Sequence, residues 1–371
     1  MTVPFWSSGE TIVAERAAIL DAIARVLDSG RLILDREVRE FESEFAARCG
    51  VQHGIGVNSG TDAIQLALRA LDIGPGKRVA TVANGAIATA AAIVSVGAVP
   101  CFVDVDRSTG LMDLDQLQAM CRAGIDCVVP VHLYGQCVDL DRLEHVANES
   151  GVPIVEDCAQ AHEASHRGRV AGSVGAMAAY SFYPTKTLGA VGDGGMVLCN
   201  DDSLATRCRR LRFYGLDETY NASESGVNSR LDELQAAVLR TRLGFLDSYV
   251  ERRRALAARY DEGLERSGVE LPGRLPGSDP SWHLYVIRHR QRDVLREGLT
   301  ARGIGTAVHY RRPIHQVDAY RDMSPTKVAL PETEARADEI LSIPLYPGLS
   351  DEDQQRVIDG IADTLSTVGG A

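Results

Sequence analysis

The sequence of 371 residues lacks the features that mark several large classes of protein. It contains no internal repeat and no low-complexity tract, and its 45% hydrophobic and 24% charged residues are ordinary values for a globular chain. These values exclude a disordered, collagenous or coiled-coil protein. Because the chain is longer than one compact core usually supports, we expect a large domain with a smaller one beside it.

The sequence also has fewer basic than acidic residues. Lys and Arg together number 39 against 51 for Asp and Glu, which gives a net charge of -12. An acidic surface repels phosphate backbones and anionic lipids, so nucleic acid and membranes are disfavoured as partners. A negatively charged substrate would therefore have to be held by local groups and not by the overall charge.

The eight cysteines include no C-x-x-C pair, so the sequence indicates neither a zinc ribbon nor a disulfide framework. Small buried thiols in a reducing cytoplasm are the expected state. The first residues, MTVPFWSSGE, have no basic region followed by an apolar run, so we expect no signal peptide. The uncharged stretch 79–103 is long enough to span a membrane, but Asn84, Gly97 and Pro100 interrupt it. We expect a strand, a loop, a buried helix and a strand there.

Apolar residues recur at helical spacing over 11–28 and predict a first amphipathic helix that ends at Ser29-Gly30. Between about 53 and 200, short apolar runs alternate with stretches of helical length, which favours a mostly parallel sheet covered by helices. Ligands of such sheets bind beyond the carboxyl ends of the strands, so we expect the active site in the loops that follow these runs.

The second half of the chain has a different pattern. Residues 231–266 contain no Pro and only two Gly, and they predict one long helix in which Gly244 is the expected position of any bend. Pro and Gly then cluster at 272–280, and the segments HLYVIR and TAVHY favour a smaller α+β domain. We therefore expect a large domain at 1–243 and a small C-terminal domain at 244–371, with the long helix linking them.

The motif SFYPTKTLGAVGDGG places Lys186 just after a strand, in a loop rich in Tyr, Pro and Gly. Apolar surroundings disfavour the ammonium form, and the neutral amine can form a Schiff base with an aldehyde. Considered alone, a solvated loop lysine is the commoner outcome.

Two further strand ends carry polar residues. In PIVEDCAQAH, Glu156 and Asp157 could hold a proton on a heterocyclic nitrogen, bind a metal or cap the next helix; no converging ligand set favours a metal. In GVNSGTDAIQLAL, a strand is followed by Ser59-Gly60-Thr61 and a helix, where backbone N–H groups could bind a phosphate or Ser59 could act as an ordinary N-cap. The Walker and dinucleotide-binding patterns are both absent. Together the three motifs offer a phosphate site, an acid for a ring nitrogen and a lysine for an aldehyde, which are the needs of pyridoxal phosphate.

These motifs, with VPVHLYGQ, NSRLDELQAAVL and VHYRRPIHQ, give a sequence that resembles the DegT/DnrJ/StrS family of pyridoxal-phosphate-dependent sugar aminotransferases over nearly the whole chain. The resemblance implies the fold-type-I α/β architecture, with a mostly parallel seven-stranded sheet in the large domain and a small α+β domain. It implies that the cofactor alternates between pyridoxal and pyridoxamine 5′-phosphate, and that no metal is needed. It also implies a homodimer with shared active sites.

The same resemblance assigns roles to residues. Lys186 would form the Schiff base and move the proton, and Asp157 would pair with the pyridine nitrogen. The remaining contacts to the cofactor would come from Gly60, Thr61 and Ser181 at the phosphate, Gln160 at the ring hydroxyl, and Asn228 at the phosphate of the neighbouring subunit.

The motifs are most similar to those of enzymes that aminate the C3 keto group of a nucleotide-linked deoxyhexose, with L-glutamate as the donor, as in antibiotic amino-sugar biosynthesis. In that subgroup Tyr183, His309 and Tyr310 would contact the sugar. The family usually has an aromatic residue near position 86, where this chain has Ala86, and the subgroup a lysine where it has Thr219. Amination at C4 is the alternative, and a non-catalytic regulator that binds the cofactor or a sugar is a remote one.

Overall fold

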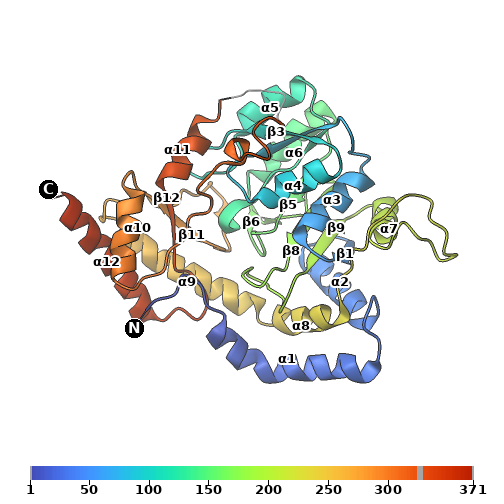
Figure 1. Ribbon diagram of the computed structural model, residues 1–371, viewed down its shortest axis with the longest axis horizontal. Helices are drawn as coiled ribbons and strands as arrows, with labels where there is room; N and C mark the ends of the chain where they lie inside the picture. Colours follow the sequence, from blue (N-terminus) through green and yellow to red (C-terminus); the bar gives the residue numbers. More distant parts are fainter. Residues whose placement is uncertain (1, 324–328, 370–371) are drawn as a thin grey trace.

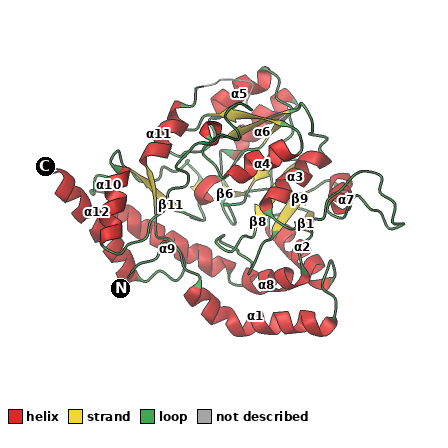
Figure 2. Ribbon diagram, in the orientation of Figure 1, coloured by secondary structure: helices red, strands yellow, loops and turns green. Residues whose placement is uncertain are grey.

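The computed structural model describes residues 2–323 and 329–369 (Figure 1). Its strands lie at the centre of the larger body with helices around them (Figure 2). The helices are α1 Gly9–Ser29, α2 Arg36–Arg48, α3 Gly60–Ala70, α4 Ile87–Ser95, α5 Leu114–Arg122, α6 Leu140–Ser150, α7 Asp202–Leu211, α8 Glu233–Leu243, α9 Leu246–Leu264, α10 Arg292–Ala301, α11 Pro331–Glu339 and α12 Asp351–Gly369. The strands are β1 His53–Val57, β2 Arg78–Val82, β3 Val99–Val103, β4 Cys127–Val128, β5 Val155–Asp157, β6 Ser165–His166, β7 Arg169–Val170, β8 Met177–Ser181, β9 Gly195–Cys199, β10 Ser278–Asp279, β11 Tyr285–Arg288 and β12 Ile340–Ile343.

The central sheet is built from the apolar runs that the sequence predicts as strands. One part has the order β1-β9-β8-β5 and the other β3-β2-β4. The parallel bridges Val128–Ile154 and Val131–Asp157 join the two parts between β4 and β5. The order is therefore β1-β9-β8-β5-β4-β2-β3, in which β9 alone runs antiparallel to its neighbours. The expectation of a mostly parallel seven-stranded sheet is confirmed.

The stretch 79–103 is divided as the sequence predicts, into β2, a loop, the buried helix α4 and β3. No helix in residues 2–323 or 329–369 combines the length and the apolar character that crossing a bilayer requires.

The single long helix expected at 231–266 is wrong in one respect, because the structure has two helices there. Helix α8 ends at Leu243, and α9 begins at Leu246. Between them the Phe245 N–H donates to Arg242 O at 3.0 Å. This bond joins residues three apart, as in a 3₁₀ turn, whereas an α-helix joins residues four apart. Gly244 has no side chain to hold the helical path, so the direction changes at this point.

Helix α9 joins two bodies in Figure 1. Its first residues, including Leu246 and Val250, belong to the core of the central sheet. Its later residues, including Leu256 and Tyr260, belong to a second core with β11, β12, α10 and α12. That second core also contains Val3 from the start of the chain. The division at 243/244 stays a prediction.

Candidate active site

A cavity of about 240 Å³ lies at the carboxyl ends of β1, β5 and β8, where the sheet topology predicts a ligand. Its floor and walls come from loops that follow these strands and from the first turns of α3 and α4. Seven of the predicted residues line it together, namely Gly60, Thr61, Asp157, Gln160, Ser181, Tyr183 and Lys186. The lining is completed by Ser59, Ile64, Ala86, Ala88, Val131, Ala159 and Asp193.

Lys186 is held in the loop after β8, where its N–H donates to Tyr183 O at 2.8 Å. The residue is half-buried. Burial of its amine lowers the pKa to about 8, and the negative charge of Asp157 opposes this shift. A solvated loop lysine does not describe this residue. Its amine is partly neutral near physiological pH, as a group that reacts with an aldehyde must be.

Asp157 ends β5 and is buried, with 4% of its surface exposed. Thr89, in the first turn of α4, donates its hydroxyl to Asp157 Oδ2 at 2.6 Å, and the Ala159 N–H donates to Oδ1 at 3.1 Å. These bonds orient the carboxylate that lines the cavity. The sequence motifs do not identify Thr89, because only the folded sheet brings α4 beside β5. Its position in the loop and helix after β2 is the one clue that the sequence offers.

The N-terminus of α3 forms one end of the cavity. Ser59 is the N-cap and accepts the Asp62 N–H at 3.1 Å, so the capping role and a place at the cavity occur together. A Cβ at Gly60 would lie 2.7 Å from Ser181 Cβ, so only glycine allows the helix to approach β8 this closely. The first amides of α3 and the Ser181 hydroxyl therefore share one small space suited to a phosphate.

Gln160 connects this cavity to the C-terminal part of the chain. Its Oε1 accepts the Tyr134 N–H at 3.0 Å, and its Nε2 donates to Tyr310 Oη at 3.1 Å. Burial raises the pKa of Tyr310 to about 12, although the Gln160 hydrogen bond lowers it. The neighbouring His309 ring nitrogen Nδ1 lies 2.8 Å from Ser342 Oγ on β12. The predicted sugar-contacting residues thus lie beside the cavity, with Tyr310 directly bonded to its lining.

Burial lowers the pKa of His309 to about 4, and the charge of Lys186 lowers it further. His309 is consequently a neutral ring at physiological pH, which can donate or accept a hydrogen bond but carries no charge. Tyr183 lies in the same loop as Lys186, lines the cavity and is 52% exposed. Asn228 is exposed in the segment between α7 and α8 and does not line this cavity.

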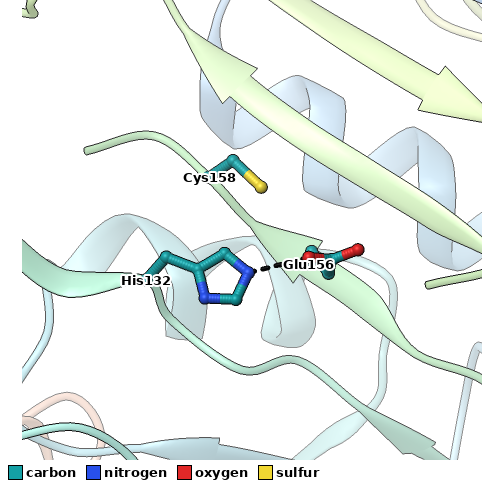
Figure 3. Close-up of side chains that lie close together, drawn as sticks. All are labelled: His132, Glu156 and Cys158. Atoms are coloured by element: carbon teal, nitrogen blue, oxygen red, sulfur yellow. Dashed lines mark hydrogen bonds and ion pairs between the residues drawn. The ribbon is translucent and has the colours of Figure 1, made fainter. Parts of the chain in front are cut away.

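A second polar group lies behind the site, where His132, Glu156 and Cys158 are close enough to hold a metal ion (Figure 3). The Glu156 carboxylate is already occupied. It accepts a hydrogen bond from His132 Nε2 at 2.8 Å and others from the N–H groups of Gly172, Val174 and Gly175. Burial raises the pKa of Glu156, but these bonds outweigh it and the pKa lies below its ordinary value. We assign this group to fixing the end of β5, and so the position of the adjacent Asp157.

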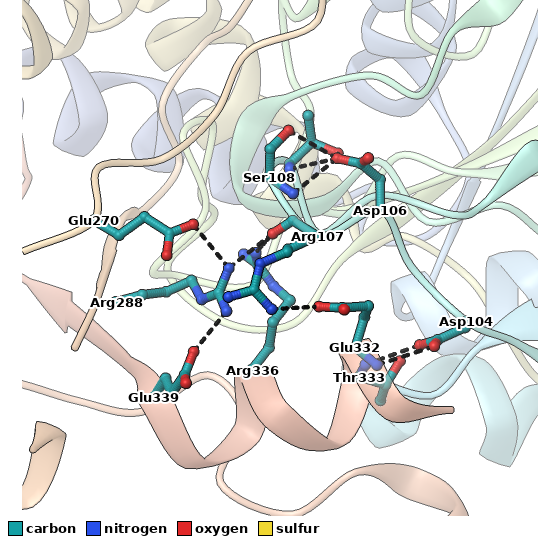
Figure 4. Close-up of polar contacts among 11 residues, drawn as sticks. Asp104, Asp106, Arg107, Ser108, Glu270, Arg288, Glu332, Thr333, Arg336 and Glu339 are labelled. Carbon is teal, nitrogen blue, oxygen red and sulfur yellow. Dashed lines mark hydrogen bonds and ion pairs between the residues drawn. The ribbon is translucent and has the colours of Figure 1, made fainter. Parts of the chain in front are cut away.

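A larger hollow of about 490 Å³ lies elsewhere, beside Arg107 and Arg288. Arg288 is buried and pairs with Glu270 at 2.9 Å and Glu339 at 2.6 Å (Figure 4). Arg107 donates to Glu332 at 3.2 Å. These charges compensate one another, and none of the predicted site residues lines this hollow. The smaller cavity around Lys186 is therefore the candidate active site.

The residues of the Lys186 cavity fit pyridoxal phosphate. The partly neutral amine suits the aldehyde, the buried carboxylate of Asp157 suits a protonated ring nitrogen, and the α3 amides suit the phosphate. Between them, Ile64, Ala86 and Val131 supply apolar walls for a flat ring. Ala86 leaves more room over that ring than an aromatic side chain would.

Comparisons with known proteins agree with this geometry. The model of the DegT/DnrJ/EryC1/StrS aminotransferase family matches residues 13–362. The dTDP-3-amino-3,4,6-trideoxy-alpha-D-glucose transaminase of Micromonospora megalomicea subsp. nigra is 44% identical over 375 residues, which cover 99% of this chain and 100% of that protein. The crystal structure of S. venezuelae DesV in complex with a ketimine intermediate matches with a TM-score of 0.95 and 46% identity, over 98% of each chain. The structure of ntda from Bacillus subtilis with bound cofactor PMP has a TM-score of 0.90 and 28% identity, and the match covers 98% of this chain and 85% of that one.

The chain belongs to the DegT/DnrJ/EryC1/StrS aminotransferase family. It has the fold-type-I architecture of these enzymes, and it is an aminotransferase whose cofactor is pyridoxal 5′-phosphate. The fold, enzyme class and cofactor expected from the sequence are confirmed. The roles of the individual site residues stay predictions.

Proposed function

We propose that this protein transfers the amino group of L-glutamate to the C3 keto group of a dTDP-linked deoxyhexose, in amino-sugar biosynthesis. The observation that carries the proposal is the enclosed Lys186 amine, which shares one cavity with Asp157 and the N-terminus of α3. The choice of C3 and of a dTDP sugar rests on the relative at 44% identity, which is named for that product.

Pyridoxal phosphate, when bound, supplies an aldehyde that takes up an amino group and a ring that accepts the electrons of a broken C–H bond. Asp157 would hold a proton on the ring nitrogen, and Thr89 orients the Asp157 carboxylate through its hydroxyl. Lys186 would move the proton between the substrate carbon and the cofactor carbon, because an amine with a pKa of about 8 can both accept and donate a proton near neutral pH. The first amides of α3 and Ser181 hold the phosphate, and Gln160 contacts the ring hydroxyl.

On the substrate side, Tyr183, His309 and Tyr310 form the hydrogen bonds to the sugar hydroxyls. The substrate's diphosphate needs a cation, and two arginines follow Tyr310 directly in the sequence. Arg311 already pairs with Asp293 at 2.9 Å. We therefore assign the diphosphate contact to the exposed Arg312.

We infer that the enzyme is a homodimer with shared active sites. On α1, Val13, Leu20 and Leu27 are 71%, 46% and 58% exposed, and their spacing of seven residues places them on one outward face. A second copy covering this face would bury them. In such a dimer the exposed Asn228 would complete the phosphate site of the neighbouring subunit. The buried free thiols of all eight cysteines suit the reducing cytoplasm in which we place the enzyme.

The experiment that tests the reaction is product analysis. The protein loaded with pyridoxal phosphate is incubated with L-glutamate and the 3-keto sugar that corresponds to dTDP-3-amino-3,4,6-trideoxy-α-D-glucose. Mass spectrometry should detect the aminated sugar, and NMR should place the nitrogen on C3. Lys186→Ala is the control and should form no product. If the matched 4-keto sugar is aminated and the 3-keto sugar is returned unchanged, the assignment to C3 is wrong.

A further inference from the structure

The residues that follow His132 form a link between the cofactor cavity and the predicted sugar-binding residues. Tyr134, in the HLYGQ motif, is 9% exposed and lies in a short 3₁₀ turn, Leu133–Gly135. It lies outside the lining of the Lys186 cavity. None of the roles assigned so far uses its side chain.

Tyr134 makes three hydrogen bonds to separate parts of the chain. Its phenol donates to the backbone carbonyl of His309. Its N–H donates to Gln160 Oε1 at 3.0 Å, and its carbonyl accepts the Leu284 N–H at 3.3 Å. One residue of the large sheet's loops is therefore bonded both to the cavity lining and to two segments of the C-terminal half.

Together with Tyr310 these contacts form a closed ring of interactions. Gln160 Nε2 donates to Tyr310 Oη at 3.1 Å, so Gln160 connects the Tyr134 backbone to the Tyr310 phenol. The Tyr134 phenol connects back to His309, the residue before Tyr310. Because Gln160 supplies the donor in its bond to Tyr310, the Tyr310 hydroxyl keeps its own proton to donate to a substrate oxygen.

The backbone of Tyr134 supports a specific role. Its φ of 59° and ψ of 13° lie in the left-handed region, which a tyrosine rarely enters because its Cβ crowds the following carbonyl oxygen. Gly135, which follows, has a φ of 95° and approaches the backbone of Trp282 and His283, where a Cβ would lie 2.6 and 2.5 Å from their nitrogens. The turn is therefore held in an unfavourable conformation against the segment that leads into β11, and this conformation presents the phenol to His309.

We propose that Tyr134 is a positioning residue for sugar binding, which holds His309 through its phenol and Tyr310 through Gln160. The proposal rests on the proposed function in one respect, namely that His309 and Tyr310 contact the sugar. The side chain of His309 is fixed from its other sides by Ser342 Oγ at 2.8 Å and by the Phe5 ring, stacked at 5.5 Å. Tyr134 supplies the link that ties this segment to the cofactor cavity.

The test compares two amino donors in the same half-reaction. Both L-glutamate and dTDP-3-amino-3,4,6-trideoxy-α-D-glucose should bleach the yellow band of the protein loaded with pyridoxal phosphate, and stopped-flow absorbance gives a second-order rate constant for each. Tyr134→Phe should lower the constant for the amino sugar about fivefold, which corresponds to one neutral hydrogen bond, and should leave that for glutamate unchanged.

The matched control is Tyr260→Phe. The Tyr260 phenol also donates to a backbone carbonyl, that of Pro344 at 2.8 Å, but it lies in the second core. This variant should keep both rate constants. The yellow band reports that a variant is folded and loaded. Loss of this band in Tyr134→Phe would show that the phenol has a general structural role, and it would overturn the proposal.

Equal losses with both donors, or no loss with either, would overturn the positioning role. A wild-type protein that is bleached by glutamate and not by the amino sugar would instead refute the proposed substrate, before any variant is compared.

Discussion

Lys186 shows how a residue type acquires its chemistry from its surroundings. In the sequence, SFYPTK taken alone favours a solvated lysine over a Schiff-base lysine. In the structure, burial brings its pKa to about 8, and Asp157 keeps it from falling further. Burial and the charge of Asp157 thus act in opposite directions on the pKa, and the amine can gain or lose a proton near neutral pH.

This balance predicts a pH dependence for loading the cofactor-free protein. Since only the neutral amine attacks the cofactor's aldehyde, the rate at which the yellow band appears should rise with pH. A lowered pKa shifts the rise to lower pH, so its midpoint should lie at about 8 and not at the ordinary 10.5. Stopped-flow absorbance at fixed cofactor concentration measures it. Lys186→Ala should give no yellow band at any pH, and a wild-type midpoint near 10.5 would contradict the enclosed amine.

Motifs identify some site residues and miss others for a physical reason. Lys186, Asp157 and Gly60 each follow a predicted strand, so the rule for parallel sheets places them together. Thr89 and Tyr134 act through contacts that only folding creates, with partners 68 and 175 residues away in the chain. Thr89 lies outside the motifs, and the VPVHLYGQ motif that contains Tyr134 does not show what its phenol contacts, so sequence reasoning could not assign their roles.

At the scale of elements, most of the large sheet could be predicted, since each apolar run became a strand. The division of the segment 231–266 into two helices could not be predicted. Helix propensity is a property of the residues themselves and does not show where tertiary packing changes the direction of the chain. The end of α8 is set by Gly244 and by the two cores that α9 must join. In place of the predicted bend, a two-residue turn at Gly244 and Phe245 separates the two helices.

The contact between α3 and β8 gives an element-scale prediction. Gly60→Ala places a Cβ 2.7 Å from Ser181 Cβ and 3.1 Å from its Cα, so the first turn of α3 must move away from the strand. We expect a loss of stability of about 1–3 kcal/mol, with weaker cofactor binding. Thermal unfolding measures the loss of stability, and titration of the cofactor-free protein with pyridoxal phosphate measures the binding.

The control for this change lies just beyond the other end of the same helix. A Cβ at Gly74 would lie 3.7 Å from its nearest neighbour, Val96 O, which is an ordinary contact. Gly74→Ala should therefore bind the cofactor as the wild type does. If Gly60→Ala also binds it normally, the close approach of α3 to β8 does not form the phosphate site.

At the scale of the whole molecule, the net charge of -12 turns out to say little about the ligands. In the proposed site, helix-end amides and a hydroxyl would hold the cofactor's phosphate, and a single arginine would hold the substrate's diphosphate. Local dipoles and single charges act within a few ångströms, whereas the overall charge is screened by salt. What it does disfavour, as the sequence indicates, is binding along an extended polyanion.

The proposed sharing of active sites between two subunits predicts complementation between two inactive variants. Lys186→Ala and Asn228→Ala should each be nearly inactive as pure proteins. When the two variants are mixed, unfolded and refolded together, about half of the dimers should contain one chain of each variant. One of the two sites in such a mixed dimer has both residues intact, so the mixture should regain about a quarter of wild-type activity. Refolding each variant alone is the control. Activity that stays at the level of the separate variants would show that Asn228 serves its own subunit or no site at all.

The most direct test of the account is the response of the purified protein to L-glutamate. The protein with pyridoxal phosphate should be yellow, and L-glutamate should bleach the band while one 2-oxoglutarate is released for each chain with an intact Lys186. Lys186→Ala should show neither change. A protein that stays colourless with added cofactor, or a yellow band that glutamate leaves unchanged, would contradict the central claim that this cavity is a transaminase site.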